Sequence, residues 1–126
     1  MLSIRLIHTA VLFFVVGVAL GMYMGIAQDF RFAHVHAHLN LLGWVALGLV
    51  GLLYHAQPLL ARGVLAHAHY WLHTVGLVVF MSGHAFAMVS GTKPVAVIGG
   101  GATMVAAGVV LLAVNVFTRL RAPARV

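Results

Sequence analysis

Long uncharged stretches separated by short connections with charged or turn-forming residues dominate the pattern along this chain. Lysine, arginine and aspartate divide it into four such stretches, residues 6–28, 32–61, 63–92 and 94–118. Each reaches the roughly 20 residues that a helix needs to cross the hydrocarbon core of a bilayer. The pattern predicts an all-α integral membrane protein, a four-transmembrane-helix up-down bundle forming one domain over residues 1–126, with helices at about 6–28, 34–56, 67–89 and 95–118.

The composition also indicates a lipid environment. Of the 126 residues, 63% are hydrophobic, and seven basic residues face a single acid. This is too little polar surface to cover a water-soluble globule. The basic residues lie between apolar runs, so the net charge of +6 does not indicate a nucleic-acid partner. The absence of cysteine excludes disulfides, thiolate metal sites, iron–sulfur clusters and covalent haem attachment.

The basic residues also predict a topology, because they favour the cytoplasmic side of a membrane. We expect both termini in the cytoplasm, in a multi-pass protein of the bacterial cytoplasmic (inner) membrane. The first stretch is too long for a signal-peptide core, so we expect it to be retained as a helix. This orientation leaves Arg31, Lys93 and Asp29 outside and places five residues inside: Arg5, Arg62, Arg119, Arg121 and Arg125.

Glycines at four-residue intervals mark the first stretch. Gly17, Gly21 and Gly25 form a small-xxx-small pattern that lets two helices approach closely. The partner can be another helix of the chain or a second copy. Residues 99–101 are three consecutive glycines and give the fourth stretch a similarly smooth surface.

Nine histidines are the unusual feature of so apolar a chain, since ionisable groups inside a bilayer are costly and mark functional sites. The intervals from His38 to His55 and from His67 to His84 each span roughly 25 Å along a helix, so we expect His38 to face His84 at one level and His55 to face His67 at the other. The predicted topology gives an outer layer of His34, His36, His38 and His84 and an inner layer of His8, His55, His67, His69 and His73.

Helical periodicity separates the histidines further. At about 100° per residue, His34 and His38 share one stripe, and His36 points nearly opposite and aligns with Asn40. In the third helix His69, His73 and His84 share one face, whereas His67 lies off it.

Neutral imidazole is a good ligand for haem iron, copper and zinc, and here it is the only strong ligand available. Two imidazoles suit a low-spin haem, and three near one point suit copper or zinc. The residues nearest the helix ends, His8, His34, His55 and His67, also fit plain hydrogen bonding to water or headgroups. We take His36, His38, His84 and His73 as candidate cofactor ligands and His38, His84, His36, His69 and His73 as candidate metal ligands.

One segment carries a family resemblance. Residues 36–44, His-Ala-His-Leu-Asn-Leu-Leu-Gly-Trp, continuing through Gly48, Gly51, Tyr54 and Pro58, resemble the second helix of the catalytic subunit I of haem-copper oxidases, closest to the nitric oxide reductase and cbb-type branches. A histidine near the outer end of that helix binds haem b. The resemblance implies that His38, or His36 in the other alignment, is the haem ligand. His84 has a weaker parallel in the copper-binding histidines of a third helix.

The chain also departs from that family. The family subunit has about twelve helices in three groups of four, so a four-helix single-unit relative suggests a closed homotrimer, with a dimer, another oligomer or a partner-bound monomer as alternatives. The His-xxx-Tyr pair of the family's copper site is absent from the second helix. One chain therefore cannot build the binuclear centre, and whether it is a catalytic oxidoreductase component stays open.

These observations favour a haem b-binding membrane protein for electron transfer or diatomic gas binding, related to haem-copper oxidase subunit I. One alternative is a membrane protein that binds or transports copper or zinc through its histidines. Another is a structural or assembly subunit of a respiratory complex. The sequence identifies the lipid bilayer as a partner but no redox partner.

Overall fold

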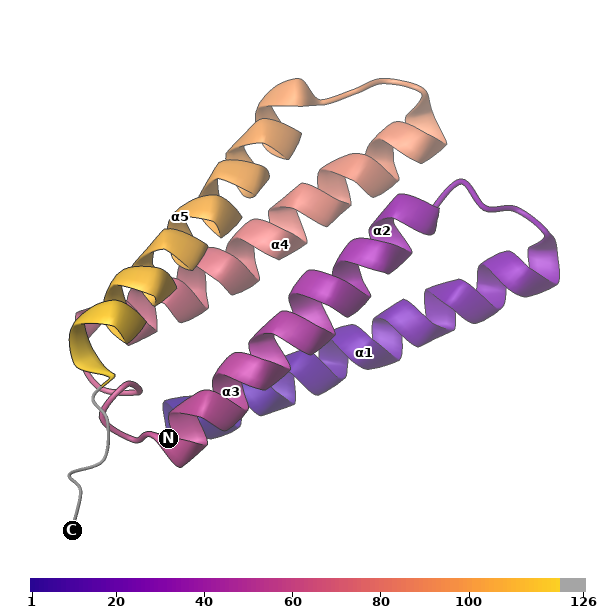
Figure 1. The fold of residues 1–126 in the computed structure, drawn as a ribbon. Helices are drawn as coiled ribbons and strands as arrows, with labels where there is room; N and C mark the ends of the chain where they lie inside the picture. The colour runs from indigo at the N-terminus through magenta and orange to yellow at the C-terminus, as the bar shows by residue number, and fades with distance from the viewer. Residues whose placement is uncertain (121–126) are drawn as a thin grey trace, which may run out of the picture.

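Four long helices make up the chain in the computed structural model, which describes residues 1–120 (Figure 1). The first is α1 (Leu2–Ala27), the third α4 (Val64–Ser90) and the fourth α5 (Val95–Arg119). The second consists of three consecutive segments, α2 (Ala33–His38), the π-helix η1 (Leu39–Ala46) and α3 (Leu47–Ala56). All four are long and apolar enough to cross a membrane, which confirms the prediction of four spanning helices. The arginines expected inside at positions 121 and 125 lie outside the described residues.

Short connections join the helices. Gln28, with a φ of 51°, ends α1 in the left-handed conformation, and Gly91, with a φ of 71°, does the same for α4. Both are common ways to end a helix. In the first connection Arg31 pairs with Asp29 at 2.7 Å. Because each connection spans only a few residues, consecutive helices run antiparallel.

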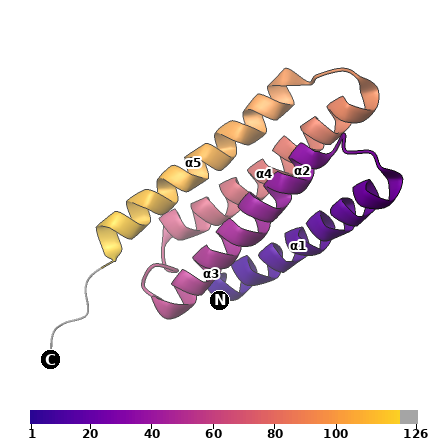
Figure 2. The ribbon, with the colours of Figure 1, turned by 45° about the vertical axis from the view of Figure 1, so that its right-hand side comes forward.

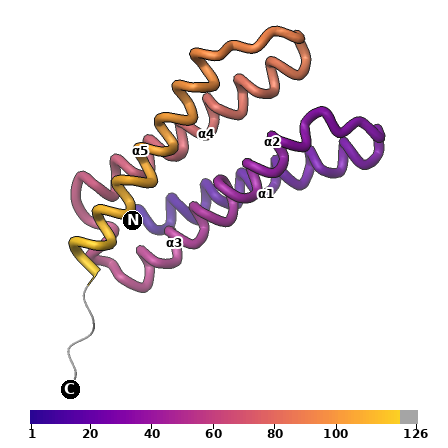
Figure 3. Tube along the Cα trace, turned by 45° about the horizontal axis from the view of Figure 1, so that its top comes forward, coloured from indigo at the N-terminus to yellow at the C-terminus, as the bar shows by residue number. Residues whose placement is uncertain are grey.

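The helices form two hairpins. α1 packs along α2, η1 and α3, while α5 packs mainly against α4 and reaches α3 through the hydrogen bond of Asn115 to Tyr54. We call the end that carries the start of α1 and the last turn of α5 the terminal end, and the other, following the predicted topology, the outer end (Figures 1 and 3). The two hairpins meet through α4, which contacts α1, α2 and η1. In the turned view of Figure 2, α4 lies behind α2 and α3, and α5 lies on the side of α4 that is away from α2 and α3. The chain thus consists of two helical hairpins.

Glycines make close helix contacts possible. A Cβ at Gly51 would lie 2.8 Å from Ile7 Cγ1 of α1, and a Cβ at Gly101 would collide with the backbone of Phe80 in α4. Gly17 and Gly21 of α1 pack against α2 and η1 of the same chain. The positions of Gly25, Gly99 and Gly100 open onto free space.

The π-helix η1 is the main departure from the regular helix expected over residues 34–56. Its wider turn interrupts the periodicity of 100° per residue from Leu39 to Ala46. Side-chain donors satisfy carbonyl groups around it: Asn40 Nδ2 donates to His36 O at 2.9 Å, and His73 Nε2 donates to Leu42 O at 3.0 Å. Hydrogen bonds from polar side chains therefore accompany the π-helix, and a hydropathy pattern does not reveal them.

The outward faces of α1 and α5 are apolar. Their large exposed side chains include Leu12, Val15, Ile26, Val110 and Phe117. Since water would make such faces costly, these helices contact lipid.

Candidate functional site

Three histidines and a phenylalanine gather where α2 approaches α4, near the outer end. The ring centres of His34 and His38 lie 4.1 Å apart, and those of His34 and His84 lie 4.4 Å apart. Phe80 meets His38 edge to face at 5.5 Å and His84 at 5.0 Å. We call these four residues the outer cluster.

The hydrogen bond of His38 determines which of its nitrogens is free. His38 Nδ1 lies 2.9 Å from the backbone carbonyl oxygen of His34, so Nδ1 carries the proton and donates it. Nε2 then keeps its lone pair. A histidine that donates one ring N–H to a carbonyl and offers the other nitrogen is the usual arrangement of a metal or haem ligand.

His84 brings the third helix into this cluster. Its ring contacts His34 of α2 and Phe80 of its own helix. It also lines a cavity of about 300 Å³ with Lys93 and Ile98, beside the connection from α4 to α5. His38 and His84 are half-buried, whereas His34 is exposed.

His36 lies on a different face. Its Nδ1 is 2.7 Å from Gly17 O of α1, and its ring lies against Gly21. The sequence left both His36 and His38 as candidates. The structure separates them, because His36 packs toward α1 and His38 toward α4.

His69 and His73 form a second, buried pair on α4. Their ring centres are 5.4 Å apart. His73 Nε2 donates to Leu42 O of the π-helix, while His73 Nδ1 and both nitrogens of His69 have no hydrogen-bond partner within residues 1–120. An unsatisfied polar group in a membrane-spanning segment is costly, so these buried nitrogens call for a partner.

The other histidines lie at the surface. His8, His55 and His67 are exposed, and His67 Nδ1 donates to Gly63 O at 3.0 Å, as expected for a residue off the ligand face. Within residues 1–120, no ring contact joins His55 with His67 or His38 with His84, although the sequence suggested that each pair faces one another. His34 is the α2 histidine whose ring meets His84.

The outer cluster is not a three-histidine metal site in this conformation. Within residues 1–120, no group of three or more histidine, aspartate or glutamate side chains is arranged to hold a metal ion. The rings of His34, His38 and His84 lie against one another, which differs from three nitrogens that converge on one point.

Sequence reasoning missed the central place of His34, which it treated as an interfacial residue. The signal was present in the four-residue spacing of His34 and His38, which puts both on one stripe of the helix. Phe80 carried no signal, since one phenylalanine in an apolar helix resembles any other.

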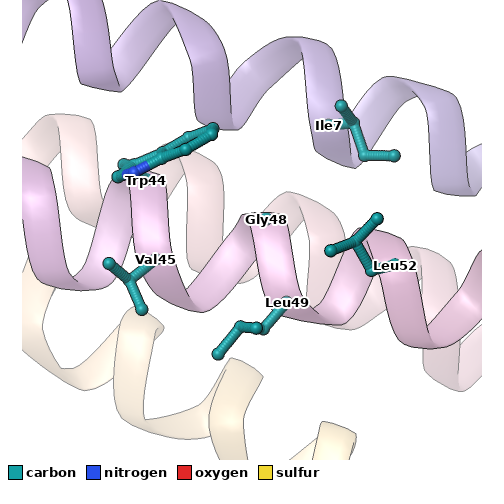
Figure 4. Close-up of a pocket in the computed structure, with 6 residues that line it drawn as sticks. All are labelled: Ile7, Trp44, Val45, Gly48, Leu49 and Leu52. Atoms are coloured by element: carbon teal, nitrogen blue, oxygen red, sulfur yellow. The ribbon is translucent and has the colours of Figure 1, made fainter.

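An apolar groove of about 250 Å³ lies between α1 and the second helix, near its middle (Figure 4). Gly48 leaves room there, and Trp44 stacks on Phe14 of α1 with ring centres 4.8 Å apart. Val45, Leu49 and Leu52 complete its lining and are exposed. Among residues 1–120, no histidine or charged side chain lines the groove, so we assign it no catalytic or metal-binding role.

Comparisons of the chain with protein-family models, with curated proteins and with solved structures found no match.

Proposed function

We propose that this chain is a haem b-binding membrane protein that transfers electrons or binds a diatomic gas, with the outer cluster as its haem site. The observation that carries the proposal is the hydrogen bond from His38 Nδ1 to His34 O, which leaves His38 Nε2 free to bind iron. His38 on α2 and His84 on α4 both contact His34 and Phe80, and both are half-buried. This supports His38 and His84 as the residues that would hold the haem.

The residues of the outer cluster fit such a group in their chemistry. Imidazole is a common axial ligand, and the aromatic face of Phe80 lies beside His38 and His84. His38 and His84 would hold the haem, and His34, whose ring contacts both, would have to turn aside to make room for it. Because His34 is exposed, it can turn toward water or headgroups.

Each residue of the cluster then has its own part. Held by both imidazoles, haem would supply one-electron chemistry, whereas haem held by only one of them would leave a position for a diatomic gas. The backbone of His34 orients His38 through the hydrogen bond at 2.9 Å. Phe80 packs against the rings of His38 and His84.

The proposal also covers the membrane topology, the family relation and the oligomeric state. We place both termini in the cytoplasm of a bacterium, because Arg5, Arg62 and Arg119 are all near the terminal end. We also propose a relation to haem-copper oxidase subunit I and assembly as a homotrimer. The open positions of Gly25, Gly99 and Gly100 support contact between copies, since small residues let helices approach closely.

Visible spectroscopy of the purified chain tests the haem proposal. The protein is expressed with a haem precursor and purified in mild detergent, and oxidised and reduced spectra are recorded with iron, copper and zinc quantified on the same sample. Sharp α and β bands on reduction, with about stoichiometric iron, are expected of a bis-imidazole haem b. His38→Ala should abolish them and His55→Ala, at the exposed terminal end, should not. A colourless protein without iron would overturn the proposal.

A second candidate function is copper or zinc binding, and the buried pair His69 and His73 favours it. Three of their ring nitrogens have no partner within residues 1–120. Structural zinc takes four ligands, so water or another copy would have to add to these two imidazoles. Copper or zinc that is retained through purification and lost in His69→Leu would support this candidate. A sample with neither haem nor metal would instead favour a structural or assembly subunit.

A further inference from the structure

A basic cavity lies at the terminal end, between the connection from α3 to α4 and the last turns of α5. Its volume is about 410 Å³. Two leucines, two arginines and two uncharged polar residues line it. The lining residues are Gln57, Leu59, Leu60, Arg62, Thr118 and Arg119.

Side-chain hydrogen bonds hold the wall of this cavity in place. Asn115, fully buried in α5, donates through Nδ2 to Leu60 O at 2.8 Å and to the hydroxyl of Tyr54 at 3.1 Å. Arg119 donates from Nη1 to Arg62 O at 2.6 Å. The guanidinium of Arg119 lies over Gly63, where a Cβ would come within 3.0 Å of Nη1. The connection is therefore fixed to α5, and the cavity is a built feature of the fold.

The charges of the cavity have no counterpart in the chain's side chains. The only acidic side chain of the protein is Asp29, and it pairs with Arg31 at the outer end at 2.7 Å. The side chain of Arg62 makes no hydrogen bond or ion pair within residues 1–120. The negative charge that balances Arg62 and Arg119 must therefore come mainly from outside the described chain.

We propose that this cavity binds the phosphate headgroup of an anionic phospholipid. It lies at the ends of two membrane-spanning helices, where headgroups are found. Guanidinium groups match phosphate oxygens in geometry and charge, and basic pockets between spanning helices bind acidic lipid headgroups. Leu59, 66% exposed, lies beside Arg62 and gives the apolar part of the lipid a surface. Basic and apolar groups side by side fit a phospholipid better than a free anion.

Lipid titration of the full chain tests the proposal. Delipidated protein in neutral detergent is titrated with phosphatidylglycerol and, separately, with phosphatidylcholine of the same acyl chains. Bound lipid is counted by native mass spectrometry, and the unfolding temperature is recorded. Phosphatidylglycerol should bind more tightly and raise the unfolding temperature. Arg62→Gln should weaken its binding about fivefold, as expected for one basic residue near a charged headgroup.

Matched variants separate this site from a general effect of charge. Lys93→Gln removes one positive charge at the outer end and should leave binding unchanged. Arg119→Lys keeps the positive charge of the cavity and serves in place of a neutral substitution at Arg119 if that substitution impairs folding. Equal affinity for the two lipids, or an equal loss in Arg62→Gln and Lys93→Gln, would overturn the proposal. A rise in unfolding temperature with millimolar inorganic phosphate alone would overturn it too, since the cavity would then be a site for small anions.

Discussion

His38 donates its Nδ1 proton to the carbonyl oxygen of His34, one helical turn earlier, and the two rings lie 4.1 Å apart. This relationship gives the two histidines different parts in the proposed haem site. The carbonyl of His34 fixes the tautomer of His38 and leaves Nε2 of His38 as the ligand atom. The ring of His34, by contrast, lies against both His38 and His84.

The first prediction follows from this division. His34→Ala keeps the backbone carbonyl that orients His38 and removes the ring between the residues proposed to hold the haem. We expect this variant to retain its reduced α and β bands at wild-type haem content or above, while His38→Ala loses them. The measurement is the reduced-minus-oxidised spectrum per mole of protein. Loss of the bands in His34→Ala with retention in His38→Ala would make His34 the ligand instead.

The same spectra decide between the two histidines that the sequence could not separate. His36 Nδ1 donates to Gly17 O at 2.7 Å, so its function is to join α2 to α1. His36→Ala should lower the unfolding temperature, because Gly17 O loses its side-chain partner, while the haem that remains keeps its band positions. Band loss in folded His36→Ala, with intact bands in His38→Ala, would reverse the assignment.

Close packing of α4 on α5 gives a third prediction. A Cβ at Gly101 would collide with the backbone of Phe80, whereas the position of Gly100 opens onto free space. Gly101→Ala should therefore destabilise the chain by about 1 to 3 kcal/mol, as overpacked sites do. Gly100→Ala is the matched control, and chemical unfolding in detergent measures both. Equal stabilities would show that the hairpin does not depend on this contact.

The sequence predicted the four spanning helices because charged residues are rare enough to divide the chain unambiguously. Helical periodicity also predicted that His34 and His38 share a stripe and that His67 lies apart. It did not predict that His34 contacts His84, since hydropathy does not specify how two helices are rotated against each other. The π-helix was not predictable either, because it depends on Asn40 and His73 bonding to carbonyl groups that only the folded chain brings within reach.

Asn115 illustrates the same limit and gives a fourth prediction. Nothing in the sequence distinguishes it from a polar residue near a helix end, yet it is fully buried and joins α5 to Tyr54 and to Leu60. Asn115→Ala leaves Leu60 O without this partner in a dry interior, so we expect a loss of about 1 to 3 kcal/mol. Tyr54→Phe removes one of the two hydrogen bonds and should cost less. Unfolding curves for both variants measure this order, which the opposite ranking would contradict.

The buried pair on α4 gives the last prediction, because its two members differ in what they bond. His73 donates to Leu42 O, so His73→Leu should cost about 1 kcal/mol or more through the unsatisfied carbonyl. Both ring nitrogens of His69 lack a partner within residues 1–120, so His69→Leu should be neutral or stabilising if nothing binds there. Unfolding of the two variants, with metal analysis of each, compares the costs. A His69→Leu variant that is destabilised more than His73→Leu and loses copper or zinc would identify His69 as a ligand and favour metal binding as the function of this pair.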